Sequence, residues 1–358
     1  MRARDLGLRL TGDTGPHNAI TDVPGVEVGY TTLVSGDAVR TGVTAILPRA
    51  REDVHLPCAA GRFSLNGNGE MTGSALIDEI GSVRLPVLIT NTHAIGPCHR
   101  GVIDWVAREK PAVAEQWLLP VVAETWDGYL NDINGPHIQP AHAVAAIDAA
   151  AGGPVAEGSV GGGTGMNCYA FKGGSGTSSR TVHYGSDAYT VGAFVQANFG
   201  SRKELTVCGV PVGADLADDN PMEDGDWMVP PGAGSVIVVI ATDAPMLPGQ
   251  CTALARRVPL GLARTGTTGS HFSGDLFLAF STGNVLTPSA FPTGDPGYDT
   301  LRHIPWNRMD DFFTAVVHAV EEAVLNALVA GKTMTGRLGR RSPALPIDRL
   351  QDLVLNRS

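Results

Sequence analysis

At 358 residues and 37.3 kDa, the chain is long enough for one large domain or two modest ones. Hydrophobic residues make up 43%, enough for a sizeable core, and 17% charged residues is low for a disordered protein. The net charge is −10, without the dense Lys/Arg cluster of a nucleic-acid-binding protein. The segment 1–10 lacks the apolar run of a signal peptide, and no 18-residue apolar stretch predicts a membrane span. We therefore expect a cytoplasmic protein.

Cysteine and histidine spacing argues against disulfides and against metal. The cysteines are widely separated, odd in number and without a CxxC pair, so we expect small buried side chains in a reducing compartment. They are Cys58, Cys98, Cys168, Cys208 and Cys251. His93 and His99 are six residues apart, and His137 and His142 five, which differs from the i, i+4 spacing of a helical zinc site. We expect no metal and no cofactor.

Short apolar runs between glycine- and proline-rich turns predict the strands. The runs are continuous and rich in β-branched residues, as expected for strands buried on both faces. In chain order they are Val43–Leu47, Val87–Thr90, Leu119–Ala123, Tyr189–Ala197 and Ser235–Thr242.

Helical periodicity appears between these runs. The predicted helices are Ser74–Ile80, Ile103–Arg108, Pro140–Ala150, Leu247–Ala263 and Met309–Val329. The last is the clearest, and Gly331 is its predicted C-cap. Strands between helical layers predict an α/β (α+β) protein, in which residues 1–358 form one compact domain with α-β-β-α layering.

The segment from Asp215 to Gly234 differs from the rest of the chain. It is acidic, rich in proline and glycine and without periodicity, so it predicts a long exposed loop. It runs directly into Ser235–Thr242, the most apolar of the predicted strands. A flexible loop that meets a buried strand at Gly234–Ser235 is an unusual junction.

The Gly234–Ser235 dipeptide permits self-cleavage. The Ser235 hydroxyl can attack the preceding carbonyl, where glycine offers the least steric bulk, and hydrolysis of the resulting ester leaves Ser235 as a new terminus. That residue then carries both a nucleophile and an α-amine with an ordinary pKa near 7.7–8, able to act as general base. The alternative is that Ser235 simply begins a strand after a turn.

Glycine-rich runs occur at two further places. The run 161–165, GGGTG, is not followed by the Lys-Ser or Lys-Thr pair that ends a P-loop. We therefore interpret it as a turn beside the active site. Gly67-Asn68-Gly69-Glu70 predicts a tight turn before a helix, with Gly67 and Asn68 as candidates to line a substrate pocket.

The junction segment, GSVIVVIATDAPMLPGQ, resembles the self-cleavage site of the β-peptidyl aminopeptidase and L-aminopeptidase/D-esterase family. Further segments resemble the same family in the same order: 18–30, 67–73, 123–137, 157–180, 189–200 and 264–284. The resemblance spans about residues 5 to 330 and implies an ornithine-acetyltransferase-like superfamily fold. It also implies cleavage into fragments 1–234 and 235–358 and a homo-oligomer, often a tetramer.

The resemblance implies roles for individual residues. Ser235 matches the nucleophile, and Ser273 and Asp275 match a Ser-x-acid pair that orients it; the acid in well-known members is Glu, one methylene longer. Asn198 matches an oxyanion-hole amide and Tyr129 a hydrogen-bond donor near the nucleophile. Each has a structural alternative. Ser273 could cap the turn before a strand 276–280, Asp275 could be a solvated turn residue, Asn198 could satisfy backbone groups, and Tyr129 could be core.

The resemblance implies an aminopeptidase acting on short peptides, amides or esters through an acyl-enzyme on Ser235. Any aminopeptidase must pair the substrate ammonium, for which Glu124 is our candidate, and His271 is the rival general base. Two alternatives remain: an ornithine acetyltransferase-like enzyme, which would use threonine, and an unprocessed metabolite-binding protein. We expect no nucleic-acid or membrane partner.

Overall fold

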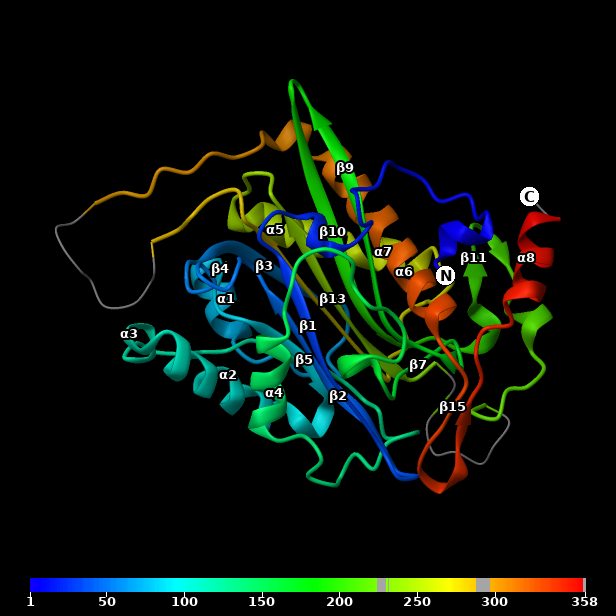
Figure 1. Cartoon of the computed structure of the whole chain (residues 1–358). Helices are drawn as coiled ribbons and strands as arrows, with labels where there is room; N and C mark the ends of the chain where they lie inside the picture. Colours follow the sequence, from blue (N-terminus) through cyan, green and yellow to red (C-terminus); the bar gives the residue numbers. More distant parts are fainter. Residues whose placement is uncertain (224–229, 231, 288–296, 357–358) are drawn as a thin grey trace.

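Most strands belong to two large sheets that stack face to face (Figure 1). The computed structural model describes residues 1–223, 230, 232–287 and 297–356. The four-stranded sheet has the order β1 (Glu27–Ser35), β2 (Val39–Leu47), β5 (Val87–Asn91), β6 (Val122–Thr125). The six-stranded sheet has the order β4 (Ser82–Val83), β3 (Cys58–Ser64), β14 (Ser273–Ser281), β13 (Gly234–Thr242), β10 (Asp187–Asn198), β9 (Gly174–Tyr184).

Helices cover the outer face of each sheet. The four-stranded sheet packs against α2 (Ile95–Glu109) and α4 (Pro140–Asp148), and the six-stranded sheet against α5 (Pro248–Ala255) and α7 (Asp310–Ala330). Helix α6 (Val258–Ala263) packs on α7. Ile46, Phe194 and Ile237 belong to the apolar core between the sheets. The predicted α-β-β-α layering of a mixed α/β protein is therefore confirmed.

The remaining α-helices and strands are short. They are α1 (Ser74–Ile80), α3 (Pro111–Ala114), α8 (Ile347–Leu355), and the hairpins β7 (Asn167–Cys168)–β8 (Phe171–Lys172), β11 (Thr206–Val207)–β12 (Val210–Pro211) and β15 (Met334–Thr335)–β16 (Arg341–Ser342).

Three predicted elements are wrong in their bounds. Ile103–Arg108 was expected as a helix, but α2 already begins at Ile95. Leu119–Ala123 was expected as a strand, but Leu119 is 52% exposed and β6 begins at Val122. Leu247–Ala263 was expected as one helix, but it is divided into α5 and α6. The break precedes Pro259, which has no backbone N–H to continue the helix.

The acidic segment 215–234 is only partly the exposed loop that we predicted. Residues 224–229 and 231 lie outside the described part of the chain. Leu216 and Asn220 are buried, and the guanidinium of buried Arg202 donates hydrogen bonds to the carbonyls of Leu216 and Asp218. Gly234 already belongs to β13. The described residues of this segment are thus held against the protein.

Helix α7 packs very closely on β9. A Cβ on Gly176 would lie 2.0 Å from the carbonyl of Ala323, and the Ser178 hydroxyl donates to the Ala319 carbonyl at 2.6 Å. Gly331 ends α7 as predicted, with φ −63°, and a Cβ there would lie 2.3 Å from the Lys172 carbonyl. By length and composition α7 could cross a membrane, but 78% of that stretch is buried inside the protein.

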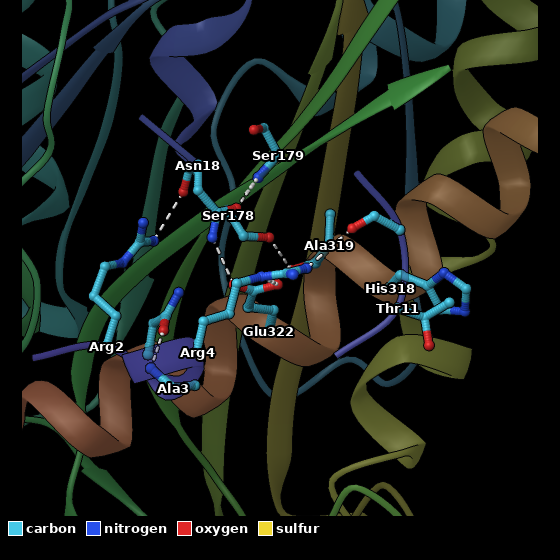
Figure 2. Close-up of polar contacts among 12 residues, drawn as sticks. Arg2, Ala3, Arg4, Thr11, Asn18, Ser178, Ser179, His318, Ala319 and Glu322 are labelled. Carbon is cyan, nitrogen blue, oxygen red and sulfur yellow. Dashed lines mark hydrogen bonds and ion pairs between the residues drawn. The ribbon is translucent and has the colours of Figure 1, made fainter. Parts of the chain in front are cut away.

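A buried ionic cluster ties the N-terminal segment to α7 and β9 (Figure 2). The Glu322 carboxylate accepts hydrogen bonds from Arg4 at 2.9 Å, from Arg180 at 2.6 Å and from the Asn18 amide at 2.5 Å. Arg4, Asn18 and Arg180 precede Gly234 in the sequence and Glu322 follows it. The cluster therefore joins the two parts of the chain on either side of the predicted cleavage site.

Candidate active site

Ser235 lies at the wall of a cavity of about 700 Å³. It is the second residue of β13, which pairs with β10 on one side and with β14 on the other. In this register Ser235 is opposite Asn198 on β10 and Gly274 on β14. Because both neighbouring strands are hydrogen-bonded to β13, the backbone at Ser235 is held in place at the start of a fully buried strand.

Two N–H groups converge on the Ser235 hydroxyl. The backbone N–H of Trp126 donates to Ser235 Oγ at 3.1 Å, and Asn198 Nδ2 lies 3.4 Å from the same oxygen. The orientation of the Asn198 amide is fixed, because its Oδ1 accepts from the Asn167 N–H at 2.9 Å and its Nδ2 donates to the Trp126 carbonyl at 2.9 Å. Such fixed donors can stabilise negative charge that develops next to the hydroxyl.

Ser273 and Asp275 lie together on β14. The Ser273 hydroxyl donates to Asp275 Oδ1 at 2.5 Å, and Asn66 Nδ2 donates to Asp275 Oδ2 at 3.2 Å. Asn66 Oδ1 in turn accepts from the Asp275 N–H at 2.7 Å. Burial raises the pKa of Asp275, while the hydrogen bonds from Ser273 and Asn66 act to lower it. Since Asp275 is buried, the alternative of a solvated turn carboxylate is wrong.

Glu124 is a buried carboxylate in the cavity wall, on β6. One oxygen accepts from the Thr92 hydroxyl and the other from the Glu70 N–H at 3.0 Å. Burial raises the pKa of Glu124, and these two hydrogen bonds act to lower it. Asn68 also lines the cavity, whereas Gly67, among the described residues, does not.

Tyr129 lines the same cavity. Its hydroxyl donates a hydrogen bond to the Arg341 carbonyl, at 3.3 Å, in the β15–β16 hairpin. Its ring lies under the Arg340 guanidinium, 5.6 Å from the ring centroid. His271 is exposed, packs edge-on against Phe272, and is not among the described residues that line the cavity.

Several residues at the site were not singled out from the sequence. Trp126 contributes a backbone N–H, for which side-chain chemistry gives no signal, and Asn66, Thr92 and Asn167 are ordinary polar residues of turns and strand ends. The run 161–165 forms a buried 3₁₀ turn that precedes Asn167 and does not itself line the cavity. Within the described ranges, no group of three His, Cys, Asp or Glu side chains is placed to bind a metal ion.

Comparison with known proteins places the chain in a family. The model of peptidase family S58 matches residues 18–342. The chain is 47% identical, over 99% of its length and 91% of the relative, to the beta-peptidyl aminopeptidase BapA of Sphingosinicella microcystinivorans.

Solved structures agree with this placement. The fold is similar to a Burkholderia sp. beta-aminopeptidase, with a TM-score of 0.91, 46% identity and 99% coverage of both chains. It is also similar to the L-aminopeptidase D-Ala-esterase/amidase of Ochrobactrum anthropi, described as a variant of the Ntn hydrolase fold. Here the TM-score is 0.92 at 43% identity, covering 99% of this chain and 98% of that chain. The chain therefore belongs to peptidase family S58.

Proposed function

We propose that this serine aminopeptidase activates itself by cutting its own chain between Gly234 and Ser235. A Cβ on residue 234 would lie 2.0 Å from the Asn198 carbonyl, so only glycine fits before the nucleophile. The Ser235 hydroxyl attacks the Gly234 carbonyl, the peptide bond becomes an ester, and water hydrolyses that ester. The products are fragments 1–234 and 235–358, and Ser235 gains a free α-amine.

In the processed enzyme, Ser235 acts as the nucleophile of an acyl transfer to water. Its α-amine takes the hydroxyl proton while Oγ attacks the carbonyl of the substrate's N-terminal residue. Asn198 Nδ2, at 3.4 Å from Oγ, and the Trp126 N–H stabilise the negative charge of the tetrahedral intermediate. The amine then protonates the leaving group, and water attacks the acyl-enzyme by the same route in reverse.

One observation carries this proposal: the same cavity contains Ser235, whose hydroxyl lies near two N–H donors, and the buried carboxylate of Glu124. We assign Glu124 to the ammonium group of the substrate, because a cation entering this partly buried site needs an opposite charge. The pair Ser273–Asp275 lies opposite Gly234 and Val236 across the parallel strands and is assigned to orient the nucleophile.

The substrate class follows from the relatives' names. We propose that the enzyme removes N-terminal residues from short β-peptides or L-amino-acid peptides and cleaves D-amino-acid amides or esters. We further propose, from the resemblance, a cytoplasmic homotetramer of processed units that needs no cofactor. The acyltransferase and metabolite-binding alternatives have no support from these comparisons.

Mass spectrometry of the purified protein tests the processing step. We expect fragments of 234 and 124 residues, about 24 and 13 kDa of the 37.3 kDa chain, with Ser235 at the new terminus. Ser235→Ala should leave one intact chain without peptidase activity, whereas Ser186→Ala, at an exposed hairpin turn, should process normally. An active wild-type enzyme that remains a single 37.3 kDa chain would contradict the mechanism.

A further inference from the structure

The active-site cavity contains a second fixed carboxylate, Glu223. Of the described residues that line the cavity, Glu124 and Glu223 are acidic and none is lysine, arginine or histidine. Processing would add at most one cation to this lining, the α-ammonium of Ser235, so two carboxylates still leave the cavity with a negative potential that acts on every charged group of a bound substrate. Only one of these carboxylates is assigned to the substrate ammonium.

Glu223 is held by neutral donors. Its Oε1 accepts from the Arg202 backbone N–H at 2.9 Å, and its Oε2 accepts from the Asn220 amide at 2.8 Å. Arg202 begins a 3₁₀ helix, Arg202–Glu204, so the first bond also satisfies a free N–H at the start of that helix. These bonds fix the carboxylate in position and leave its charge uncompensated by any ion pair within the described residues.

Glu124 is connected to the β14 side of β13, and Glu223 to the β10 side. Glu124 is beside Gly69, which is in close contact with Gly274, the neighbour of Ser235 on β14. Glu223 instead bonds to Arg202, four residues after Asn198, the neighbour of Ser235 on β10. If Glu124 takes the substrate ammonium, the leaving group extends across Ser235 toward Glu223.

Three arginines anchor the segment that carries Glu223. Arg202 donates to the Leu216 and Asp218 carbonyls, at 2.8 and 3.3 Å. Arg349 pairs with Asp218 at 2.7 Å, and Arg341 pairs with Asp219. The groups that these arginines hold, at residues 216–219, all lie upstream of the proposed cut, while Arg341 and Arg349 belong to the downstream fragment. Breaking the bond at Gly234 therefore leaves the anchors of Glu223 in place.

We infer that Glu223 sets the charge specificity of the leaving-group side, so that the enzyme favours cationic or neutral leaving groups and disfavours those with a carboxylate. This inference rests on the proposed function, because it needs Glu124 to hold the substrate ammonium. A leaving group that bears lysine gains a favourable interaction with Glu223, while one that bears a carboxylate is repelled by it.

Three substrates that differ only in leaving-group charge test this inference on the processed enzyme. They are the dipeptide amides β-Ala-Lys-NH2, β-Ala-Leu-NH2 and β-Ala-Glu-NH2. The side chains of their leaving groups carry charges of +1, 0 and −1. We expect kcat/KM to fall in that order, with a ratio of at least about tenfold between the lysine and glutamate amides. Glu223→Gln should reduce this ratio to about threefold or less.

Glu204→Gln is the matched control. Glu204 also accepts a backbone N–H of the same turn, that of Ser201 at 2.9 Å, but it does not line the cavity among the described residues. The ratio of kcat/KM between the lysine and glutamate amides should be the same in Glu204→Gln as in the wild type. A Glu223→Gln ratio equal to the wild-type ratio would overturn the inference.

The wild-type enzyme provides a second test that does not depend on how Glu223→Gln folds or processes. Raising the salt concentration should shrink the ratio between lysine and glutamate amides, because counterions screen charges in a cavity open to solvent. A wild-type ratio near one, or a ratio that salt leaves unchanged, contradicts the inference alone. An enzyme that cleaves none of the three amides would instead contradict the proposed function.

Discussion

Asn198 and Ser235 are register partners on neighbouring antiparallel strands, and the Asn198 side-chain nitrogen lies 3.4 Å from the Ser235 hydroxyl. The Asn167 N–H occupies the oxygen end of that amide, so the nitrogen end must face Ser235. The donor is therefore in place before substrate binds, which is the condition under which it lowers a barrier most effectively.

Removing this donor should slow the chemical step. We expect Asn198→Ala to lower kcat by about 10²- to 10³-fold with a smaller change in KM, because the bond strengthens as negative charge develops. Steady-state kinetics on protein of verified mass would measure this. Asn134→Ala, at an exposed position, is the control. A processed Asn198→Ala enzyme with nearly wild-type kcat would remove Asn198 from the oxyanion site.

Glu124 should make substrate binding depend on pH. Burial raises the pKa of Glu124, so its negative charge is lost at a higher pH than for an ordinary glutamate. We expect KM to rise as the pH falls through this raised pKa, and Glu124→Gln to raise KM by about 10- to 100-fold and abolish that dependence. The control is the exposed Glu79→Gln. A KM that is unchanged in Glu124→Gln would assign the ammonium to another group.

The pH dependence of kcat/KM distinguishes the candidate general bases. Asp275 is bound by Ser273 and Asn66, so we expect Asp275→Asn to lower kcat by about 100-fold without moving the acid limb set by the Ser235 amine. His271→Ala should change kcat little, since His271 is exposed outside the described cavity lining.

Each of these variants could also refute the assignment. An acid limb that moves to lower pH in Asp275→Asn would mean that Asp275 pairs with the amine and holds its pKa up. A large loss of kcat in a folded, processed His271→Ala enzyme would transfer the role of general base to His271.

The ionic cluster at Glu322 should stabilise the fold. Glu322 is fully buried, and removing its charge leaves Arg180 buried without its partner, at a cost of about 3–5 kcal/mol. Thermal or denaturant unfolding of Glu322→Gln would measure it. Asp104→Asn, which breaks the exposed Arg100–Asp104 pair, should cost about 0.5 kcal/mol or less.

The same cluster predicts a dependence on pH. Burial acts to raise the pKa of Glu322, but the hydrogen bond from Arg4 and the charge of Arg180 outweigh it and lower the pKa. A lowered pKa means that the stabilisation is complete above the ordinary glutamate range and is lost as the pH falls through the folded-state value. The stability difference between wild type and Glu322→Gln should therefore shrink in acid.

The sequence by itself determined the features that depend on local pattern. Continuous apolar β-branched runs are enough to specify a doubly buried strand, which is why Ser235–Thr242 lies within β13. The apolar periodicity of Met309–Val329 likewise specified α7 to within one residue at each end. Ser273 and Asp275 are two residues apart, and their side chains meet at the start of one strand.

Only the tertiary structure decided which distant groups meet. Strand β9, rich in Gly, Ser and Thr, has no apolar pattern, and it is buried because its small residues let α7 approach closely at Gly176 and Ser178. Trp126 directly follows β6 of the other sheet, and its N–H reaches Ser235 although the two residues are 109 apart in sequence. A backbone donor has the same chemistry at every residue, so its role is set by sheet packing, which no local pattern encodes.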